Sequence, residues 1–307
     1  MGMKDIVWKG ERISRFVLGT AQLGMDYGIA NVCGQPSEKL VCEIVKTALG
    51  YGVNCFDTAQ AYGNSEVVLG MALRYCGAEP DIKIVSKLSP ELQPTDCEAV
   101  EQSIEISRQN LHVDQLWCLM LHRADWLDSW HKGLGQTLRR SKQTGGVRYL
   151  GVSVYTPDDA RRALEHADIQ VIQVPCSLWN QRMLREGIFE LAKKKSKLLF
   201  VRSIYLQGLL LLSPQDVAKK LPVAKRASQK WYELAAQFGM SPKNLSISFG
   251  LSLNAPLVIG VENIQQLNEN AQLFQQAPLS TDASEGIRSQ MSPFLSYEIV
   301  DPSLWQN

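Results

Sequence analysis

Short apolar runs rich in β-branched residues alternate along the chain with longer segments whose apolar positions recur at helical spacing. The apolar runs occupy residues 16–18, 53–56, 82–86, 116–121, 149–154, 171–174, 198–201 and 257–259. The helical pattern covers most of residues 38–51, 99–110, 126–144, 158–166, 185–194, 222–238 and 242–253. About eight strand–helix units in this order predict an α/β fold, and a closed (β/α)8 TIM barrel fits them better than an open sheet.

The segments outside this alternation predict smaller features. Residues 5–7 and 12–16 predict an N-terminal β-hairpin that turns at Lys9-Gly10-Glu11. Residues 209–218 predict an irregular excursion, and the tail from residue 276 predicts a loop that packs back over one end of the barrel. Because no repeat, low-complexity tract or linker interrupts the chain, residues 1–307 are expected to form a single domain.

Two predicted helix starts carry capping signals directly after a strand. Thr95 and Glu98 have the spacing of a capping box, in which Thr95 accepts a hydrogen bond from a first-turn amide. Thr156 is a predicted N-cap with Pro157 at the first helical position.

Charge and cysteine usage narrow the classes of protein. Lys and Arg number 32 against 31 Asp and Glu, so there is no overall field to attract nucleic acid or an anionic membrane, and neither partner is expected. The most apolar stretch, KLLFVRSIYLQGLLLL, is interrupted by Arg202 and Gln207, which argues against a membrane span. The seven cysteines are widely spaced without a CxxC pair, which predicts a reducing, cytoplasmic setting and no zinc site.

Ionisable residues stand where three of the predicted strands end. Asp57 ends the second strand, Lys87 the third and His122 the fourth, while Tyr62 lies five residues beyond Asp57. Each alone has a structural interpretation: a solvent-facing lysine, a rim histidine, a packing tyrosine. However, the strand ends of a parallel barrel form one face, and such groups are costly to bury unless they meet. We therefore expect the four side chains to converge.

An Asp, Lys, Tyr and His set without a metal suits proton transfer to a carbonyl oxygen. A free phenol has a pKa near 10, and the Lys87 ammonium is expected to lower the pKa of Tyr62. Asp57 would orient Lys87, and His122 would hydrogen-bond the substrate oxygen. Because such a site supplies no electrons, a hydride donor must bind nearby. A hydrolase or lyase that uses Asp57 and His122 is a weaker alternative, since no second carboxylate or metal set accompanies them.

Motifs in a fixed order now give a resemblance. They are LGTAQLG at 18–24, FDTAQAYG at 56–63, SK at 86–87, LH at 121–122, GVS at 151–153, QVPCSLWN at 173–180 and GVENIQQLNEN at 260–270. Through them nearly the whole chain resembles the aldo-keto reductase family. The resemblance implies a (β/α)8 barrel that binds NADH or NADPH in extended form without a Rossmann domain. Consistently, no GxGxxG follows a predicted strand, and Gly133-Leu134-Gly135 falls within a helical segment as a local break.

Residue by residue, the resemblance implies that Tyr62 is the general acid/base and that Lys87, Asp57 and His122 are its partners. It implies a cofactor site for NAD or NADP and no metal. Its residues would be Gly19 and Thr20 at the nicotinamide ribose, Ser153 and Gln173 at the carboxamide, Arg202, Ser203, Tyr205, Gln207 and Gly208 along the nicotinamide and pyrophosphate, and Gly260, Glu262, Gln266, Glu269 and Asn270 around the adenosine.

Three positions depart from the pattern of the family. Val154 replaces an asparagine after GVS, which removes a polar contact to the carboxamide. Arg202 replaces an aromatic residue that stacks on the nicotinamide, which suggests an altered cofactor clamp. Glu262 stands where NADP-preferring members place Lys or Arg, and it favours NAD.

The substrate is expected to be a small molecule, an aldehyde, a ketone or the corresponding alcohol, with sugars and their derivatives as candidates. Aromatic residues of the predicted loops could stack on a sugar or simply pack as a lid; they are Tyr27, Trp126, Trp130 and Trp179. A monomer or small homo-oligomer is expected. The alternative is a weakly active or inactive cofactor-sensing subunit of a larger assembly; Val154 and Arg202 keep it open, and the complete relay set argues against it.

Overall fold

The computed structural model of the chain describes residues 5–78 and 81–305, so residues 1–4, 79–80 and 306–307 of the predicted domain lie outside it. Eight parallel strands close into a barrel in sequence order. The strands are β3 (Phe16–Gly19), β4 (Cys55–Asp57), β5 (Lys83–Lys87), β6 (Leu116–Leu121), β7 (Val147–Ser153), β8 (Val171–Pro175), β9 (Leu198–Arg202) and β10 (Leu257–Gly260). The predicted (β/α)8 TIM barrel is confirmed.

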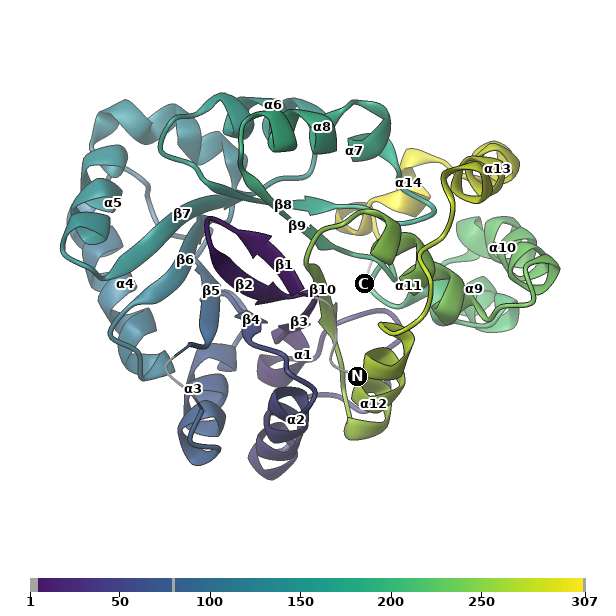
Figure 1. The fold of residues 1–307 in the computed structure, drawn as a ribbon, viewed down its shortest axis with the longest axis horizontal. Helices are drawn as coiled ribbons and strands as arrows, with labels where there is room; N and C mark the ends of the chain where they lie inside the picture. Colours follow the sequence, from purple (N-terminus) through teal and green to yellow (C-terminus); the bar gives the residue numbers. More distant parts are fainter. Residues whose placement is uncertain (1–4, 79–80, 306–307) are drawn as a thin grey trace.

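Helices surround the barrel on the outside (Figure 1). They are α1 (Ala21–Gly24), α2 (Glu38–Gly50), α3 (Ser65–Tyr75), α4 (Cys97–Leu111), α5 (Leu134–Gln143), α6 (Pro157–Glu165), α7 (Arg182–Arg185), α8 (Ile188–Lys194), α9 (Pro214–Lys220), α10 (Lys225–Gln237), α11 (Pro242–Ser252), α12 (Ile264–Leu273), α13 (Thr281–Met291) and α14 (Tyr297–Val300). Short 3₁₀ helices cover Ala124–Lys132, Leu209–Leu211, Pro222–Ala224, Ser292–Phe294 and Pro302–Leu304. Within the described part of the chain, no helix is both long and apolar enough to cross a membrane.

The strands read as continuous apolar runs because both of their faces are buried. Every residue of β6, LWCLML, is buried. One apolar cluster, with Phe16, Leu18 and Phe56, packs the strands against the helices. A second cluster, with Val17 and Phe200, belongs to the alternate strand positions and fills the barrel interior. The burial on two faces explains why the strand pattern could be read from the sequence.

The helix starts confirm one predicted cap and correct the other. The Thr156 hydroxyl accepts from the Asp159 amide, and Pro157 opens α6 as predicted. At α4 the cap is Asp96 and not Thr95, because the Asp96 carboxylate accepts from the Ala99 amide. Both residue types cap helices well, so the sequence left the position ambiguous by one residue.

Other boundaries differ from the prediction where backbone conformation intervenes. The predicted helix at 126–144 is split at Gly133, whose φ of 109° ends the 3₁₀ helix before α5 begins. Residues 209–218 were predicted as irregular, but Ser213 caps α9 there and the second half is helical. Helices α3 and α12 also form where no helix was predicted.

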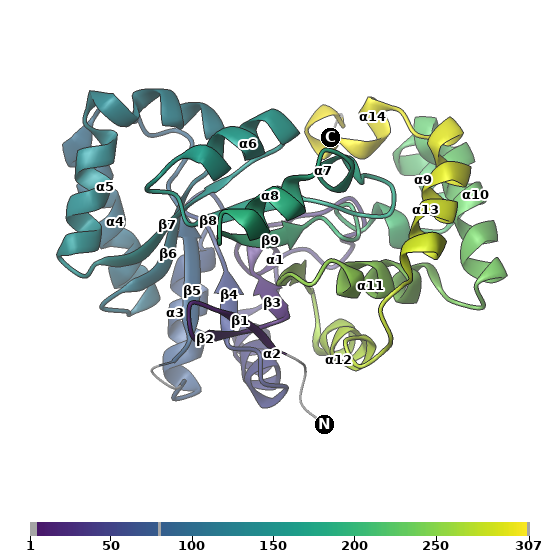
Figure 2. The same cartoon turned by 45° about the horizontal axis from the view of Figure 1, so that its top comes forward.

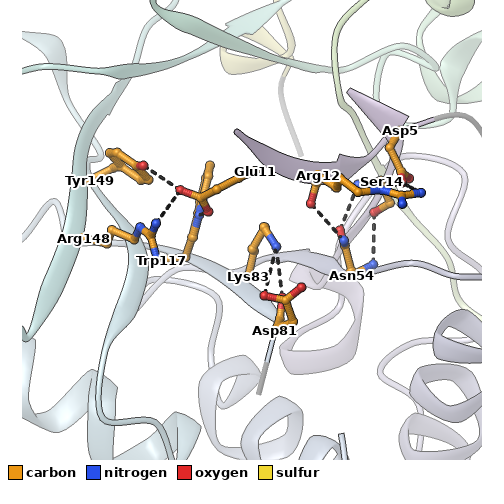
Figure 3. Close-up of polar contacts among 10 residues, drawn as sticks. All are labelled: Asp5, Glu11, Arg12, Ser14, Asn54, Asp81, Lys83, Trp117, Arg148 and Tyr149. Atoms are coloured by element: carbon orange, nitrogen blue, oxygen red, sulfur yellow. Dashed lines mark hydrogen bonds and ion pairs between the residues drawn. The ribbon is translucent and has the colours of Figure 1, made fainter. Parts of the chain in front are cut away.

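The hairpin of β1 (Asp5–Trp8) and β2 (Glu11–Ser14) lies across one end of the barrel (Figure 1). Figure 3 shows how Glu11 fastens it to the strands. The Glu11 carboxylate accepts from Trp117 Nε1 at 2.7 Å and from the Tyr149 hydroxyl at 2.6 Å, and Arg148 Nη2 lies 2.9 Å from it. The predicted hairpin is confirmed, and it closes the N-terminal end of the barrel.

The C-terminal tail packs on the opposite side, beside α7 (Figure 2). The Arg182 guanidinium lies 4.9 Å from the centroid of the Tyr297 ring, and Asn180 Nδ2 donates to the Val300 carbonyl at 3.5 Å. The predicted tail does pack back over a barrel end, but as α13 and α14 rather than as a loop.

Candidate active site

The ends of β4 and β5 bring together a buried ion pair. Lys87 Nζ donates to Asp57 Oδ2 at 2.8 Å and to the Thr58 carbonyl at 2.8 Å. Gln173, in the middle of β8, donates from Nε2 to the other Asp57 oxygen at 2.6 Å. The two charges are fully enclosed, with side-chain exposures of 0% for Lys87 and 4% for Asp57. Because both carboxylate oxygens are hydrogen-bonded, the pair offsets much of the cost of its own burial.

A tight turn after β4 places Tyr62. A Cβ on Gly24 would lie 2.0 Å from the Tyr62 carbonyl, and a Cβ on Gly63 would lie 2.2 Å from the Gly24 carbonyl. Gly63 also has a φ of +57°. Both glycines are therefore required for the turn to approach α1 closely enough.

The four predicted relay residues meet at this point. Lys87 Nζ lies 4.9 Å from the centroid of the Tyr62 ring. The His122 ring packs edge-on against the same tyrosine, with ring centroids 5.9 Å apart. Lys87 thus faces the Tyr62 ring, while its hydrogen bonds go to Asp57 and Thr58.

The pKa of Tyr62 shifts in the opposite direction from the prediction. Burial raises it far above the ordinary value of a phenol, the Asp57 charge adds to the rise, and Arg202 opposes it. The Lys87 ammonium, paired with Asp57 at 2.8 Å, does not outweigh this rise in the pKa of Tyr62. The folded chain therefore holds Tyr62 as a neutral phenol, which is the form that donates a proton.

His122 is also uncharged in the fold. Burial lowers its pKa to about 3, and the nearby charges of Lys87 and Arg202 act in the same direction. Its Nδ1 is buried and has no hydrogen-bond partner among the residues that the structure describes. A buried polar atom without a partner is costly, and this one is available to a bound molecule.

A cavity of about 370 Å³ opens beside Asp57 and Tyr62. Ligand sites of small molecules have volumes of roughly this size. Every predicted cofactor residue except Ser153 lines it: Gly19, Thr20, Gln173, Arg202, Ser203, Tyr205, Gln207, Gly208, Gly260, Glu262, Gln266, Glu269 and Asn270. Ser153 is buried but does not belong to this lining. Lys87 and His122, like Ser153, do not belong to the lining.

The segment of residues 203–208 has a strained backbone. Ser203, Leu206 and Gln207 have φ values of 63°, 50° and 53°, in the left-handed region that favours glycine. Two side-chain contacts hold the segment: the Tyr205 hydroxyl donates to Asn270 Oδ1 at 2.7 Å, and Gln207 Nε2 donates to the Tyr27 hydroxyl at 3.2 Å. Strain of this kind concentrates at functional sites.

The structure adds cavity residues that the sequence analysis did not select. Gln22 packs so closely that a Cβ on Gly260 would lie 2.0 Å from its Oε1. Lys243, on the first turn of α11, pairs with Glu269 at 2.6 Å. The helix start Ser241-Pro242 is legible in the sequence, but nothing local indicates that α11 faces the cavity.

Two of the three unusual positions, Arg202 and Val154, are in contact. Arg202 Nη2 donates to the Val154 carbonyl at 3.2 Å, and Nη1 donates to the Ser203 hydroxyl at 3.2 Å. Its guanidinium carbon lies 4.3 Å from the centroid of the Tyr155 ring. Glu262, at the other end of the cavity lining, accepts from Gln266 Nε2 at 3.3 Å.

The model of the Aldo/keto reductase family matches residues 15–290. The chain belongs to this family. As an aldo-keto reductase it is an oxidoreductase by class. The sequence resemblance, drawn from seven short motifs, is thereby confirmed.

This aldo-keto reductase is similar to named relatives and to solved structures. "Probable aldo-keto reductase 1" of Glycine max is 29% identical over 168 residues, which cover 49% of this chain and 45% of the relative. L-galactose dehydrogenase of Arabidopsis thaliana is 25% identical over 283 residues, 85% of this chain and 84% of the relative. The structure of the glycerol dehydrogenase AKR11B4 from Gluconobacter oxydans superposes with a TM-score of 0.73 at 20% identity, covering 98% of this chain and 99% of that one. The last likeness concerns the fold.

Proposed function

We propose that the protein is an NAD(P)-dependent aldo-keto reductase that interconverts a carbonyl compound and an alcohol, with Tyr62 as general acid/base. The observation that carries the proposal is the meeting of Tyr62 with the Asp57–Lys87 pair and His122 beside the cavity. A set of this kind can move a proton to or from an oxygen atom, but it needs a bound reductant.

The cavity fits a nicotinamide dinucleotide. At Gly19 a Cβ would lie 3.0 Å from Val258 Cγ1, so the barrel rim can tolerate no larger side chain where a ribose is expected. The His122 ring packs edge-on against Tyr62, and its Nδ1, which has no partner among the described residues, suits a substrate oxygen. NADH or NADPH would supply the hydride, and the predicted cofactor residues that line the cavity, Arg202 aside, would hold it.

The adenosine end favours NAD. Glu262 lines the cavity, and its carboxylate would repel the 2′-phosphate of NADPH. The cavity-lining cation at this end, Lys243, is already paired with Glu269. A 2′-phosphate would therefore meet two carboxylates and a cation that is already engaged.

Proton transfer in the reduction direction follows from the ionisation states. Tyr62 donates its hydroxyl proton to the carbonyl oxygen as that oxygen gains electron density. The neutral His122 can hydrogen-bond the same oxygen. The Lys87 ammonium at the ring face then stabilises the phenolate that Tyr62 becomes, while Asp57 holds the ammonium in place. In the oxidation direction the phenolate takes the proton back.

The substrate is proposed to be a sugar or a sugar-derived carbonyl compound or alcohol. Of the four aromatic residues considered for stacking, Tyr27 lines the cavity. Trp126, Trp130 and Trp179 are buried, and Trp130 Nε1 donates to Asp168, so these three pack the fold. The name of one relative, L-galactose dehydrogenase, supports a polyhydroxy compound.

The test combines a variant with two nucleotide titrations. Tyr62→Phe should lower turnover by about a hundredfold to ten-thousandfold, which is the usual contribution of general acid–base catalysis. Its affinity for NADH, measured by fluorescence quenching, should stay within about threefold of the unsubstituted protein. NADPH should bind more weakly than NADH. Unchanged turnover in Tyr62→Phe, or no binding of either nucleotide, would sink the proposal.

A second candidate is a cofactor-sensing subunit with slow or no turnover. The observation that favours it is the hydrogen bond from Arg202 to the Val154 carbonyl. At these two positions the family has an aromatic residue and an asparagine. Binding of NADH without reaction across an aldehyde and sugar panel, together with a stable partner protein, would establish it.

We further propose that residues 1–307 act as one barrel unit in the cytoplasm, as a monomer or small homo-oligomer. The widely spaced, unpaired cysteines support that compartment.

A further inference from the structure

Arg202 carries a charge that its surroundings do not neutralise. Its guanidinium donates to a carbonyl and a hydroxyl, both of them uncharged acceptors. Among the residues that the structure describes, no carboxylate forms an ion pair with it. The other two cations at the cavity are matched, since Lys87 pairs with Asp57 and Lys243 pairs with Glu269.

The neighbours of Arg202 at the reaction site add no compensating charge. Tyr62 and His122 are neutral, as described above, and Asp57 forms its ion pair with Lys87. Arg202 acts on the pKa of both Tyr62 and His122, which puts its charge within electrostatic reach of the reacting oxygen. The reaction end of the cavity therefore has a net positive charge.

The side chain of Arg202 reaches across the strand ends. Arg202 ends β9, and its Nη2 donates to the carbonyl of Val154, which follows β7. Because β8 lies between these strands, the guanidinium crosses the carboxyl end of β8. It also contacts Ser203, and it lines the same cavity as Tyr62.

The Arg202 guanidinium is held against an aromatic ring, and some of its N–H donors make no hydrogen bond to the residues that the structure describes. It stacks on the Tyr155 ring at 4.3 Å, and the Tyr155 side chain is 44% exposed, so the group lies near the mouth of the site. A guanidinium has five N–H donors, of which two are used here. The remaining fork matches the two oxygens of a carboxylate.

We propose that Arg202 binds a carboxylate of the substrate, and that the enzyme acts on carbonyl or hydroxy acids in preference to neutral aldehydes, ketones and alcohols. The inference rests on the proposed hydride-transfer function and deepens it by naming the substrate class.

The test uses pairs of acid and neutral substrates: glyoxylate against methyl glyoxylate, succinate semialdehyde against butanal, and glucuronate against glucose, each with NADH. The unsubstituted enzyme should prefer at least one acid over its partner. Arg202→Gln should lower kcat/KM for that acid by about tenfold to a hundredfold, the loss of a charge-assisted contact, and change the neutral partner less than about threefold. Arg202→Lys keeps the charge but not the planar pair of donors, so its kcat/KM for the acid should lie between those of the unsubstituted enzyme and Arg202→Gln. Arg226→Gln, an exposed arginine on α10, is the matched control for the loss of one charge.

Two further readouts separate this inference from the function on which it rests. Malonate and malonamide do not react, and each is titrated against the NADH complex of every variant by fluorescence. If malonate binds, malonamide does not, and the binding of malonate is lost in Arg202→Gln, the carboxylate site is supported even if no substrate turns over. Turnover of acid and neutral substrates with equal kcat/KM in all variants would overturn the inference while leaving the function intact. Weakened NADH binding in Arg202→Gln, with equal losses for both substrate types, would assign Arg202 to the cofactor and also overturn it.

Discussion

The two ends of the barrel each hold a carboxylate in a network of hydrogen bonds, but only one network is complete. At the hairpin end, Glu11 contacts Trp117, Tyr149 and Arg148, all on the barrel strands (Figure 3). At the other end, Asp57 contacts Lys87 and Gln173 in much the same manner.

The difference lies in the atoms around each carboxylate. Beside Asp57, His122 Nδ1 is buried without a partner among the described residues, and Tyr62 lines an open cavity. Beside Glu11, the indole and phenol donors both end on the carboxylate itself. A network that satisfies all its members stabilises a closed end, whereas one that leaves donors and acceptors at a cavity is prepared for a ligand.

The strongest way to break this comparison is to remove Lys87. Lys87→Met should abolish turnover and lower the free energy of unfolding by about 3–5 kcal/mol, because it leaves the buried Asp57 carboxylate without its counter-charge. Urea unfolding and steady-state kinetics measure the two effects. The double variant Asp57→Asn with Lys87→Met should regain much of the stability and none of the activity. A single variant as stable as the unsubstituted protein would contradict the burial argument.

The complementary change is made at the hairpin end. Glu11→Gln removes the ion pair with Arg148 and weakens two hydrogen bonds, so it should cost about 1.5–3 kcal/mol of stability. Turnover should stay within about twofold, because this network lies across the barrel from Tyr62. Arg12→Gln is the control: its pair with Asp5 is exposed and should contribute less than about 1 kcal/mol. A large loss of activity in Glu11→Gln would mean that the two ends are coupled.

The smallest expected effect is a change in pH dependence. The pKa of His122 is lowered to about 3 in the fold from 6.5, so the unfolded chain takes up a proton first as the solution is acidified. The stability contributed by the neutral imidazole is complete above about pH 6.5 and is lost as pH falls toward 3. His122→Asn should therefore lose less stability than the unsubstituted protein between pH 7 and pH 4.5, measured as urea midpoints. His131→Asn, which removes an exposed imidazole, is the control, and equal slopes in all three proteins would refute the assignment.

The ordering of strands and the relay residues could be read from the sequence because their signals are local. Strands buried on both faces leave continuous apolar runs, and a charged residue that ends such a run is conspicuous. The same reasoning located Asp57, Lys87 and His122, and the FDTAQAYG motif added Tyr62. Helix α3 was missed because its start at Asn64 has no side-chain cap. Helix α12 was missed although Asn263 caps it.

The tertiary structure decided what each of these residues experiences. The sequence predicted that Lys87 would lower the pKa of Tyr62, but the pairing of Lys87 with Asp57 and the burial of the phenol reverse the direction. It also decided that Lys243 lines the cavity and that Arg202 crosses β8 to reach Val154. By itself the sequence determined the barrel, the family and the four groups that can move a proton. Charges, donors and cavities depend on distances between residues far apart in the chain, and only the closed barrel sets those distances.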